Sequence, residues 1–131
     1  MVSVFVYGTL LVGESNHRVA KPYLKDVQPG KVKGRLYSVG AFPALVLDED
    51  KGREIEGEWF TVAEEGLAAM DWLEGYRGPG MANFYDRVWV KDMENNREGW
   101  VYVWNDSKGY PEIECGSWRR HIGESLKDAH V

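Results

Sequence analysis

Glu74 is the residue whose position most directly points to chemistry. It ends a predicted helix, residues 63–74, and follows the apolar Leu67 and Met70 by seven and four positions. Helical spacing therefore places Glu74 on the apolar face. A carboxylate in the last turn, just before Gly75, also faces the negative end of the helix dipole. On that face, desolvation and the dipole would both raise the pKa of Glu74, and a carboxyl group with a pKa near neutrality can accept and return a proton.

Position alone leaves a simpler alternative open, and it is the commoner one. The side chain of Glu74 can turn outward into solvent, or it can pair with Arg77 or Arg87. In either case the carboxylate would stay ionised and would have no catalytic role. A second chemical feature is needed to decide between these interpretations.

That second feature is the turn Tyr7-Gly8-Thr9-Leu10, which follows a predicted strand. Consecutive backbone N–H groups in such a turn can hold a carboxylate or a developing oxyanion, and Gly8 lets a ligand approach the backbone closely. An ordinary turn without a ligand is the alternative, because Tyr-Gly-Thr alone is a weak motif. We interpret Asn16 and His17 as the start of a helix that holds the turn in place.

Other catalytic patterns are missing from the sequence. The single cysteine, Cys115, excludes an internal disulfide and a Cys-only metal site. No serine stands in a G-x-S-x-G context, and there is no Walker A or G-x-G-x-x-G motif. The three histidines lack the spacing of zinc ligands: they are His17, His121 and His130.

Composition narrows the class of protein further. The chain has 131 residues and a net charge of −5, so we expect one domain spanning residues 1–131 and no nucleic-acid partner. The most basic stretch, residues 118–121, is too short to change that expectation. No basic leader and no membrane-length apolar run occur, so we expect no membrane partner and a cytoplasmic protein.

The elements that must position Glu74 and the turn follow from apolar periodicity and turn residues. Strands are predicted at residues 2–7, 32–38, 44–47, 54–62, 85–91 and 99–104, and helices at 16–24, 63–74 and 117–129. We interpret residues 48–52 as a charged hairpin tip and residues 94–96 as a hairpin turn. This order predicts an α+β fold with a mixed, strongly bent sheet, a small β-barrel flanked by short helices.

Five motifs make the sequence resemble the γ-glutamylcyclotransferase-like family, which includes the γ-glutamylamine cyclotransferases and other AIG2-like proteins. The resemblance extends from about residue 4 to about residue 121. Its two specific motifs are Val6-Tyr7-Gly8-Thr9-Leu10, followed by Gly13 and Asn16-His17, and Asp71-Trp72-Leu73-Glu74-Gly75-Tyr76. The supporting segments are residues 40–44, 84–88, and 101–104 with 116–119.

The resemblance implies a small mixed β-barrel with a cavity at one end, and neither a metal nor a cofactor. It implies that Glu74 is the proton acceptor. It also implies that substrate is bound by Tyr7, Gly8, Thr9 and Leu10, and we expect Tyr102 to form a wall of the cavity. From strand alternation alone, Tyr102 and Trp104 face one side of a strand, where core packing is the expected role. Tyr76 and Arg87 we interpret as structural.

The implied reaction needs no enzyme nucleophile. A small γ-glutamyl amine or peptide cyclises when its own α-amine attacks the γ-carbonyl, which gives 5-oxoproline and a free amine. Glu74 would move the proton, and the turn would hold the substrate carboxylate or the oxyanion. The sequence departs from the expected family pattern at two places. Leu11-Val12 stands where a polar or basic pair is expected, and Ser117 stands where Asp is expected. Both departures concern the specificity for the amine that leaves.

Two other classes of function stay open at this point. One is a non-catalytic module on the same barrel that binds a small carboxylate with the turn. The other is a protein–protein adaptor that uses exposed tryptophans such as Trp72 and Trp118, although we expect both indoles to pack in the core. Glu74 favours the enzyme, because a carboxylate binder gains nothing from a second negative group nearby.

Overall fold

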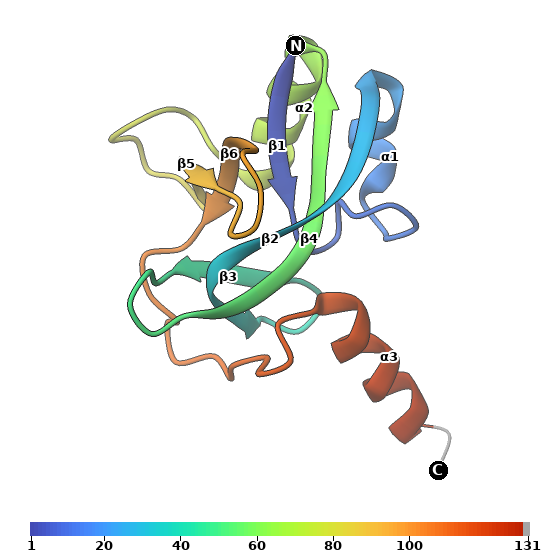
Figure 1. Ribbon diagram of the computed structural model, residues 1–131, viewed down its shortest axis with the longest axis vertical. Coiled ribbons are helices and arrows are strands. Elements are labelled where there is room, and N and C mark those ends of the chain that lie inside the picture. Colours follow the sequence, from blue (N-terminus) through green and yellow to red (C-terminus); the bar gives the residue numbers. More distant parts are fainter. Residues whose placement is uncertain (130–131) are drawn as a thin grey trace.

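The computed structural model describes residues 1–129, so His130 lies outside the described residues. No helix in that range is both long and apolar enough to cross a membrane. The elements follow the order β1 (Val2–Val6), α1 (His17–Ala20), the 3-10 helix η1 (Lys21–Tyr23), β2 (Leu24–Ser38), β3 (Pro43–Leu47), β4 (Arg53–Val62), α2 (Glu64–Glu74), β5 (Asp86–Lys91), β6 (Glu98–Val103) and α3 (Trp118–Ala129) (Figure 1).

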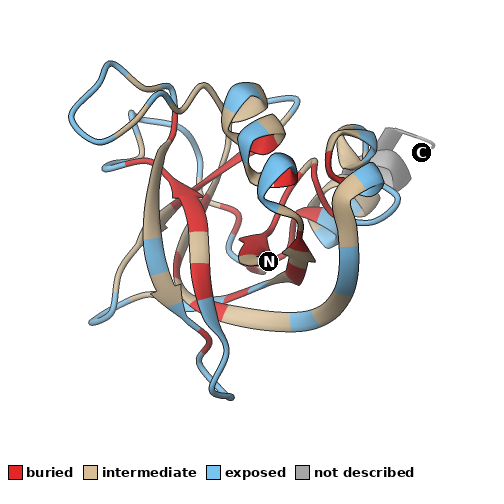
Figure 2. Cartoon of the chain, turned by 90° about the horizontal axis from the view of Figure 1, so that it is seen from above, coloured by how far each residue is buried: buried red, intermediate tan, exposed pale blue. Residues whose placement is uncertain are grey.

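The strands form one mixed sheet in the order β3-β2-β4-β1-β6-β5. Within the described part of the chain, β1 and β6 are the one parallel pair, and the other neighbouring strands are antiparallel. The sheet curls into a half-barrel around buried residues (Figure 2). The backbone amide of Trp104 donates to the carbonyl of Leu45 at 2.9 Å, which links the end of β6 to β3. The predicted α+β class and bent mixed sheet are therefore confirmed, as is the β5–β6 hairpin around residues 94–96.

The central strand β1 is buried on both faces. Val4 and Val6 belong to one apolar cluster, which includes Met70 of α2, whereas Phe5 belongs to a second cluster with Trp59. Successive side chains of a strand point to opposite faces, so both faces of β1 must carry apolar residues. Burial on both faces explains why nearly every residue of the first strand is apolar. It also fixes the direction in which the chain leaves β1 for the turn after Val6.

Two predicted elements near the first helix need correction. The helix expected over residues 16–24 is shorter, because Pro22 cannot continue the α-helical hydrogen bonding and the chain tightens into η1. Strand β2 starts at Leu24, well before the predicted residue 32. Pro29 reads as a break in a strand, so the sequence pattern did not indicate the first half of β2. The proline is tolerated because β3 pairs only with residues 34–38 of β2, which leaves one edge of β2 free around Pro29.

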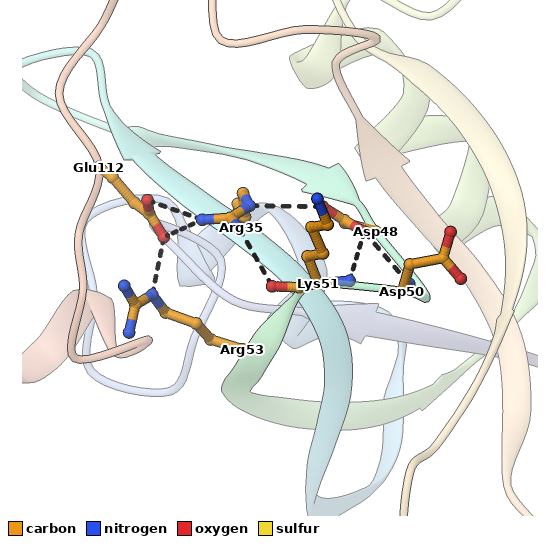
Figure 3. A network of polar contacts seen from close by, with 6 residues as sticks. All are labelled: Arg35, Asp48, Asp50, Lys51, Arg53 and Glu112. Carbon is orange, nitrogen blue, oxygen red and sulfur yellow. Dashed lines mark hydrogen bonds and ion pairs between the residues drawn. The ribbon is translucent and has the colours of Figure 1, made fainter.

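The charged turn after β3 is not a hairpin tip, because β3 and β4 lie on opposite sides of β2. The segment instead crosses β2 at Gly34, which pairs with both Leu47 and Arg53, and it is held by Arg35 of that strand. The guanidinium of Arg35 donates to Asp48 at 3.3 Å and to the carbonyl of Lys51 at 3.1 Å (Figure 3). Glu112 accepts from Arg35 at 3.1 Å and from Arg53 at 2.9 Å, which ties the last loop to the same point.

The two candidate adaptor tryptophans differ in their environments. Trp118 is buried, as predicted. The prediction for Trp72 is wrong, since 86% of this residue is exposed. The reason is helical geometry: Gly66 and Met70 mark the buried face of α2, and a residue two positions after Met70 lies on the opposite side.

Candidate active site

Helix α2 places Glu74 at the edge of the half-barrel. The helix buries Gly66 and Met70 against the sheet, and Leu67 and Leu73 pack partly against the same cluster. Gly75 ends the helix in the left-handed conformation with φ of 69°, a conformation that favours glycine. As predicted from the spacing, Glu74 lies toward the apolar side, where it is half-buried and lines a cavity.

The carboxylate of Glu74 has no hydrogen-bond or ion-pair partner among residues 1–129. Arg87, one of the proposed partners, pairs with Asp71 instead. Desolvation by burial raises the pKa of Glu74 from its ordinary value to about 7. The structure therefore does not support the simpler interpretation, in which Glu74 turns outward or pairs with an arginine.

The turn after β1 is closed by a hydrogen bond from the amide of Leu11 to the carbonyl of Gly8, at 3.1 Å. Within residues 1–129, the amides of Gly8, Thr9 and Leu10 have no hydrogen-bond acceptor. A Cβ atom on Gly8 would come within 2.6 Å of the Pro43 ring, so only glycine fits against Pro43 at this position. The turn thus combines tight packing with free N–H donors.

Asn16 and His17 hold this turn by hydrogen bonds. Asn16 donates from its side chain to the Thr9 hydroxyl at 3.0 Å and from its backbone amide to the Thr9 carbonyl at 2.8 Å. The Nδ1 atom of His17 lies 3.0 Å from the Leu10 carbonyl. Both residues stand at the start of α1, in agreement with their interpretation as supports of the turn.

One cavity of about 150 Å³ brings Glu74 and the turn together. All six residues proposed for the site line it: Tyr7, Gly8, Thr9, Leu10, Glu74 and Tyr102. Sequence reasoning assigned no role in the cavity to the other lining residues, which are Phe5, Val6, Asn16, Phe42, Pro43, Leu73, Phe84 and Tyr85. Four of these residues, Phe42, Pro43, Phe84 and Tyr85, lie in the motif segments 40–44 and 84–88, so the motifs were the sequence feature that pointed to them.

Three buried tyrosines line the cavity together with Glu74, and none of their hydroxyl groups donates to it. Tyr7 donates to the carbonyl of Tyr102 at 2.7 Å and accepts from the amide of Leu45 at 3.2 Å. Tyr85 donates to the carbonyl of Pro43 at 2.8 Å. Burial raises the pKa of all three phenols, so they stay neutral near pH 7 while Glu74 titrates.

Tyr102 is oriented from outside the cavity by Asp71. Its hydroxyl donates to Asp71 at 2.7 Å, and the same carboxylate pairs with Arg87. The guanidinium of Arg87 lies 4.8 Å from the Tyr76 ring centre and 4.5 Å from the Trp100 ring centre. Neither Tyr76 nor Arg87 lines the cavity, which agrees with their interpretation as structural residues.

The arrangement can move a proton beside a group held by backbone N–H donors. No serine or cysteine lines the cavity, and the Thr9 hydroxyl accepts a hydrogen bond from Asn16 without a base beside it. Among residues 1–129, no group of three or more His, Cys, Asp and Glu side chains is placed to hold a metal ion. The site therefore suits general acid–base chemistry on a substrate that carries its own nucleophile.

Comparison with known proteins gives independent information. The family model for "Gamma-glutamyl cyclotransferase, AIG2-like" matches residues 4–120. The chain is 35% identical over 125 residues to the gamma-L-glutamyl-butirosin B gamma-glutamyl cyclotransferase of Niallia circulans, covering 92% of this chain and 78% of that protein.

Two solved structures share the fold. An uncharacterized protein from Pyrococcus horikoshii superposes with a TM-score of 0.74 at 19% identity, over 97% of this chain and 98% of the other. An AIG2-like protein from Mus musculus superposes with a TM-score of 0.66 at 21% identity, over 87% of this chain and 86% of the other.

Proposed function

This chain belongs to the AIG2-like gamma-glutamyl cyclotransferase family and is a cyclotransferase-type enzyme, and we propose that it converts γ-glutamyl amides into 5-oxoproline and a free amine. Glu74 acts as the general acid–base group. One observation carries the proposal: a carboxyl group with a pKa of about 7 shares a cavity with three backbone amides, and within residues 1–129 none of these groups has a hydrogen-bond partner.

In the first half of the reaction, the α-amine of the γ-glutamyl group attacks its own γ-carbonyl carbon. A C–N bond forms and closes a five-membered ring, and Glu74 takes the proton that the attacking nitrogen loses. Because the nucleophile and the carbonyl belong to one molecule, the site only has to hold the reacting conformer. A positioned general base of this kind contributes about 10²- to 10⁴-fold to the rate.

In the second half, the original amide C–N bond breaks. Glu74 returns its proton to the leaving nitrogen, so the amine departs neutral and the reaction neither consumes water nor releases a net proton. The amides of Gly8, Thr9 and Leu10 hold the substrate α-carboxylate or the oxyanion on the γ-carbonyl oxygen. Tyr7, Tyr85 and Tyr102 line the cavity beside these groups with buried side chains.

A pKa near 7 suits both halves of this cycle. A carboxylate with the ordinary pKa of 4.5 is a weak base toward an ammonium group. A carboxyl group that titrates near 7 is present at neutral pH in substantial amounts of both its protonated and its ionised form. The same burial that destabilises the ionised Glu74 thus makes it a better proton carrier.

The test measures 5-oxoproline released from a panel of γ-glutamyl amides. We expect turnover of at least one amide, and a loss of about 10²- to 10⁴-fold in kcat for Glu74→Gln. The matched control is Glu65→Gln, the same change at an exposed position of α2, which should retain the wild-type rate. Saturable binding of γ-glutamyl amides without any turnover would instead identify a carboxylate-binding module, and full activity of Glu74→Gln would exclude the proposed mechanism.

A further inference from the structure

We propose that Phe42, Phe84 and Lys108 form the subsite for the leaving amine, and that they select neutral aromatic amines over cationic ones. The inference rests on the proposed function and deepens it, because it assigns the amine side that the sequence left open. Three observations support it: the depth of the cavity, the aromatic rings at its exposed end and the charge beside these rings.

The cavity has a buried end and an exposed end. Gly8, Leu10, Tyr85 and Tyr102 are buried, whereas 51% of Phe84 is exposed. The glutamyl head therefore binds at depth, where its carboxylate or oxyanion can reach the free amides. The group attached to the amide nitrogen then extends toward the exposed end, past Phe84 and the half-buried Phe42.

The exposed end is an array of aromatic rings. Phe84 lies edge-to-face with Phe42, Tyr85 and Trp104, with ring centres 5.9, 5.1 and 5.7 Å apart respectively. These neighbours fix the orientation of the Phe84 ring while half of the residue stays in contact with solvent. A flat apolar group on the leaving amine would cover that surface and pack against rings that are already positioned.

Lys108 places a positive charge directly beside these rings. The ammonium group of Lys108 lies 4.2 Å from the Trp104 ring centre and 6.0 Å from the Phe84 ring centre. No ion pair involves Lys108 within residues 1–129, and Asp106 on the same turn uses its Oδ1 to accept the backbone amide of Lys108 at 2.9 Å. Among the lining residues, Glu74 is the sole carboxylate, and it is placed for the reacting nitrogen.

This local charge opposes the charge of the whole chain, which is −5 and would attract cations from a distance. Screening limits that attraction to about 8–10 Å at physiological ionic strength, so a bound cationic amine mainly senses the nearby Lys108 ammonium. The rim therefore disfavours a polyamine-like leaving group and accepts a neutral one.

Three matched substrates test the subsite: the γ-glutamyl amides of benzylamine, butylamine and 1,4-diaminobutane. The expected order of kcat/KM is benzyl above butyl above aminobutyl, with about three- to tenfold between the first two. Phe84→Ala should lower the benzyl-to-butyl ratio toward one, and Phe42→Leu should lower it in the same direction with less change in packing. Because Phe84 is half exposed, its truncation is compatible with folding.

Lys108→Glu should raise kcat/KM for the aminobutyl amide relative to the butyl amide by about tenfold. The control is Lys91→Glu, which changes net charge equally at an exposed position on β5, away from the cavity. Cyclisation without the expected order, or with ratios that neither variant shifts, would overturn the subsite and leave the proposed function standing. If none of a broad panel of amides is cyclised, the proposed function fails, and the subsite with it.

Discussion

Glu74 lies in an environment that favours its neutral form, and this has a consequence for folding that is separate from catalysis. Its pKa is about 7 in the folded protein and near 4.5 in the unfolded chain. The folded state therefore binds the proton more tightly. The stabilising contribution is complete below pH 4.5 and is lost as the pH rises through 7, with a total of roughly 3 kcal/mol.

Glu74→Gln should consequently be more stable than the wild type at alkaline pH. Gln cannot ionise, so the variant avoids the cost of a buried charge while it keeps nearly the same shape. We expect the two proteins to differ little at pH 4 and by up to about 3 kcal/mol in the free energy of unfolding at pH 8.5. Urea denaturation at both pH values measures this difference, and a difference that does not change with pH would show that Glu74 titrates normally.

At the scale of elements, the turn after β1 is positioned from two sides. Pro43 at the start of β3 contacts Gly8, and Asn16 at the start of α1 binds Thr9. Neither β3 nor α1 contributes a charged group to the cavity. Their role is to keep the three free amides at a fixed distance from the end of α2.

Gly8→Ala should therefore damage both stability and activity. The new Cβ would lie 2.6 Å from Pro43, so the turn or β3 must shift. We expect a loss of about 1–3 kcal/mol in the free energy of unfolding and of about 10²-fold in kcat/KM. The control is Gly123→Ala in α3, where among the described residues no atom beyond the adjoining helix backbone lies within 4 Å of the added Cβ. A Gly8→Ala protein with unchanged kcat/KM would mean that the position of the turn does not matter for catalysis.

The elements also show where sequence reasoning succeeds and where it stops. The placement of Glu74 and of the turn followed from local patterns: helical spacing, a glycine stop and a strand that ends in a glycine. The first half of β2 was missed, because a proline in a strand reads as a break unless the free edge is known. The charged turn was misread as a hairpin, because nothing local shows that β2 lies between β3 and β4.

The contact between Phe42 and Phe84 could not be predicted for a similar reason. Each lies in a loop, and the motifs 40–44 and 84–88 that contain them do not by themselves place either ring in the cavity. Their rings meet only because the curled sheet brings the start of β3 beside the loop before β5. The prediction that Trp72 packs in the core was wrong, although the reason is local. The size of the indole favoured burial, but the position of Trp72 on α2 turns it toward solvent.

At the scale of the whole molecule, Tyr7 connects distant parts of the sheet. It follows the central strand β1, donates to the carbonyl of Tyr102 in β6 and accepts from the amide of Leu45 in β3. The same two strands are joined by the hydrogen bond from Trp104 to Leu45. Strands at separate places in the sheet order are thus drawn together, and the resulting half-barrel encloses the cavity.

Tyr7→Phe should weaken this closure. The variant keeps the ring but leaves a buried carbonyl and a buried amide without their partner, which costs about 1–3 kcal/mol for each unsatisfied group. The free energy of unfolding from urea denaturation measures the loss. Tyr37→Phe on β2 is the matched control, because its hydroxyl makes no hydrogen bond within residues 1–129. Equal stability of both variants would mean that the Tyr7 hydroxyl does not hold the sheet together.

The central claim is that Glu74 carries the proton in the cyclisation of γ-glutamyl amides. Its most direct test is the pH dependence of kcat/KM for 5-oxoproline release by the wild type and by Glu74→Gln. We predict an ascending limb with an apparent pKa of about 7 in the wild type. In the weakly active Glu74→Gln protein this limb should vanish, while any limb from the substrate amine remains in both. A limb near 7 that persists in Glu74→Gln, or a wild-type limb near 4.5, would contradict the account.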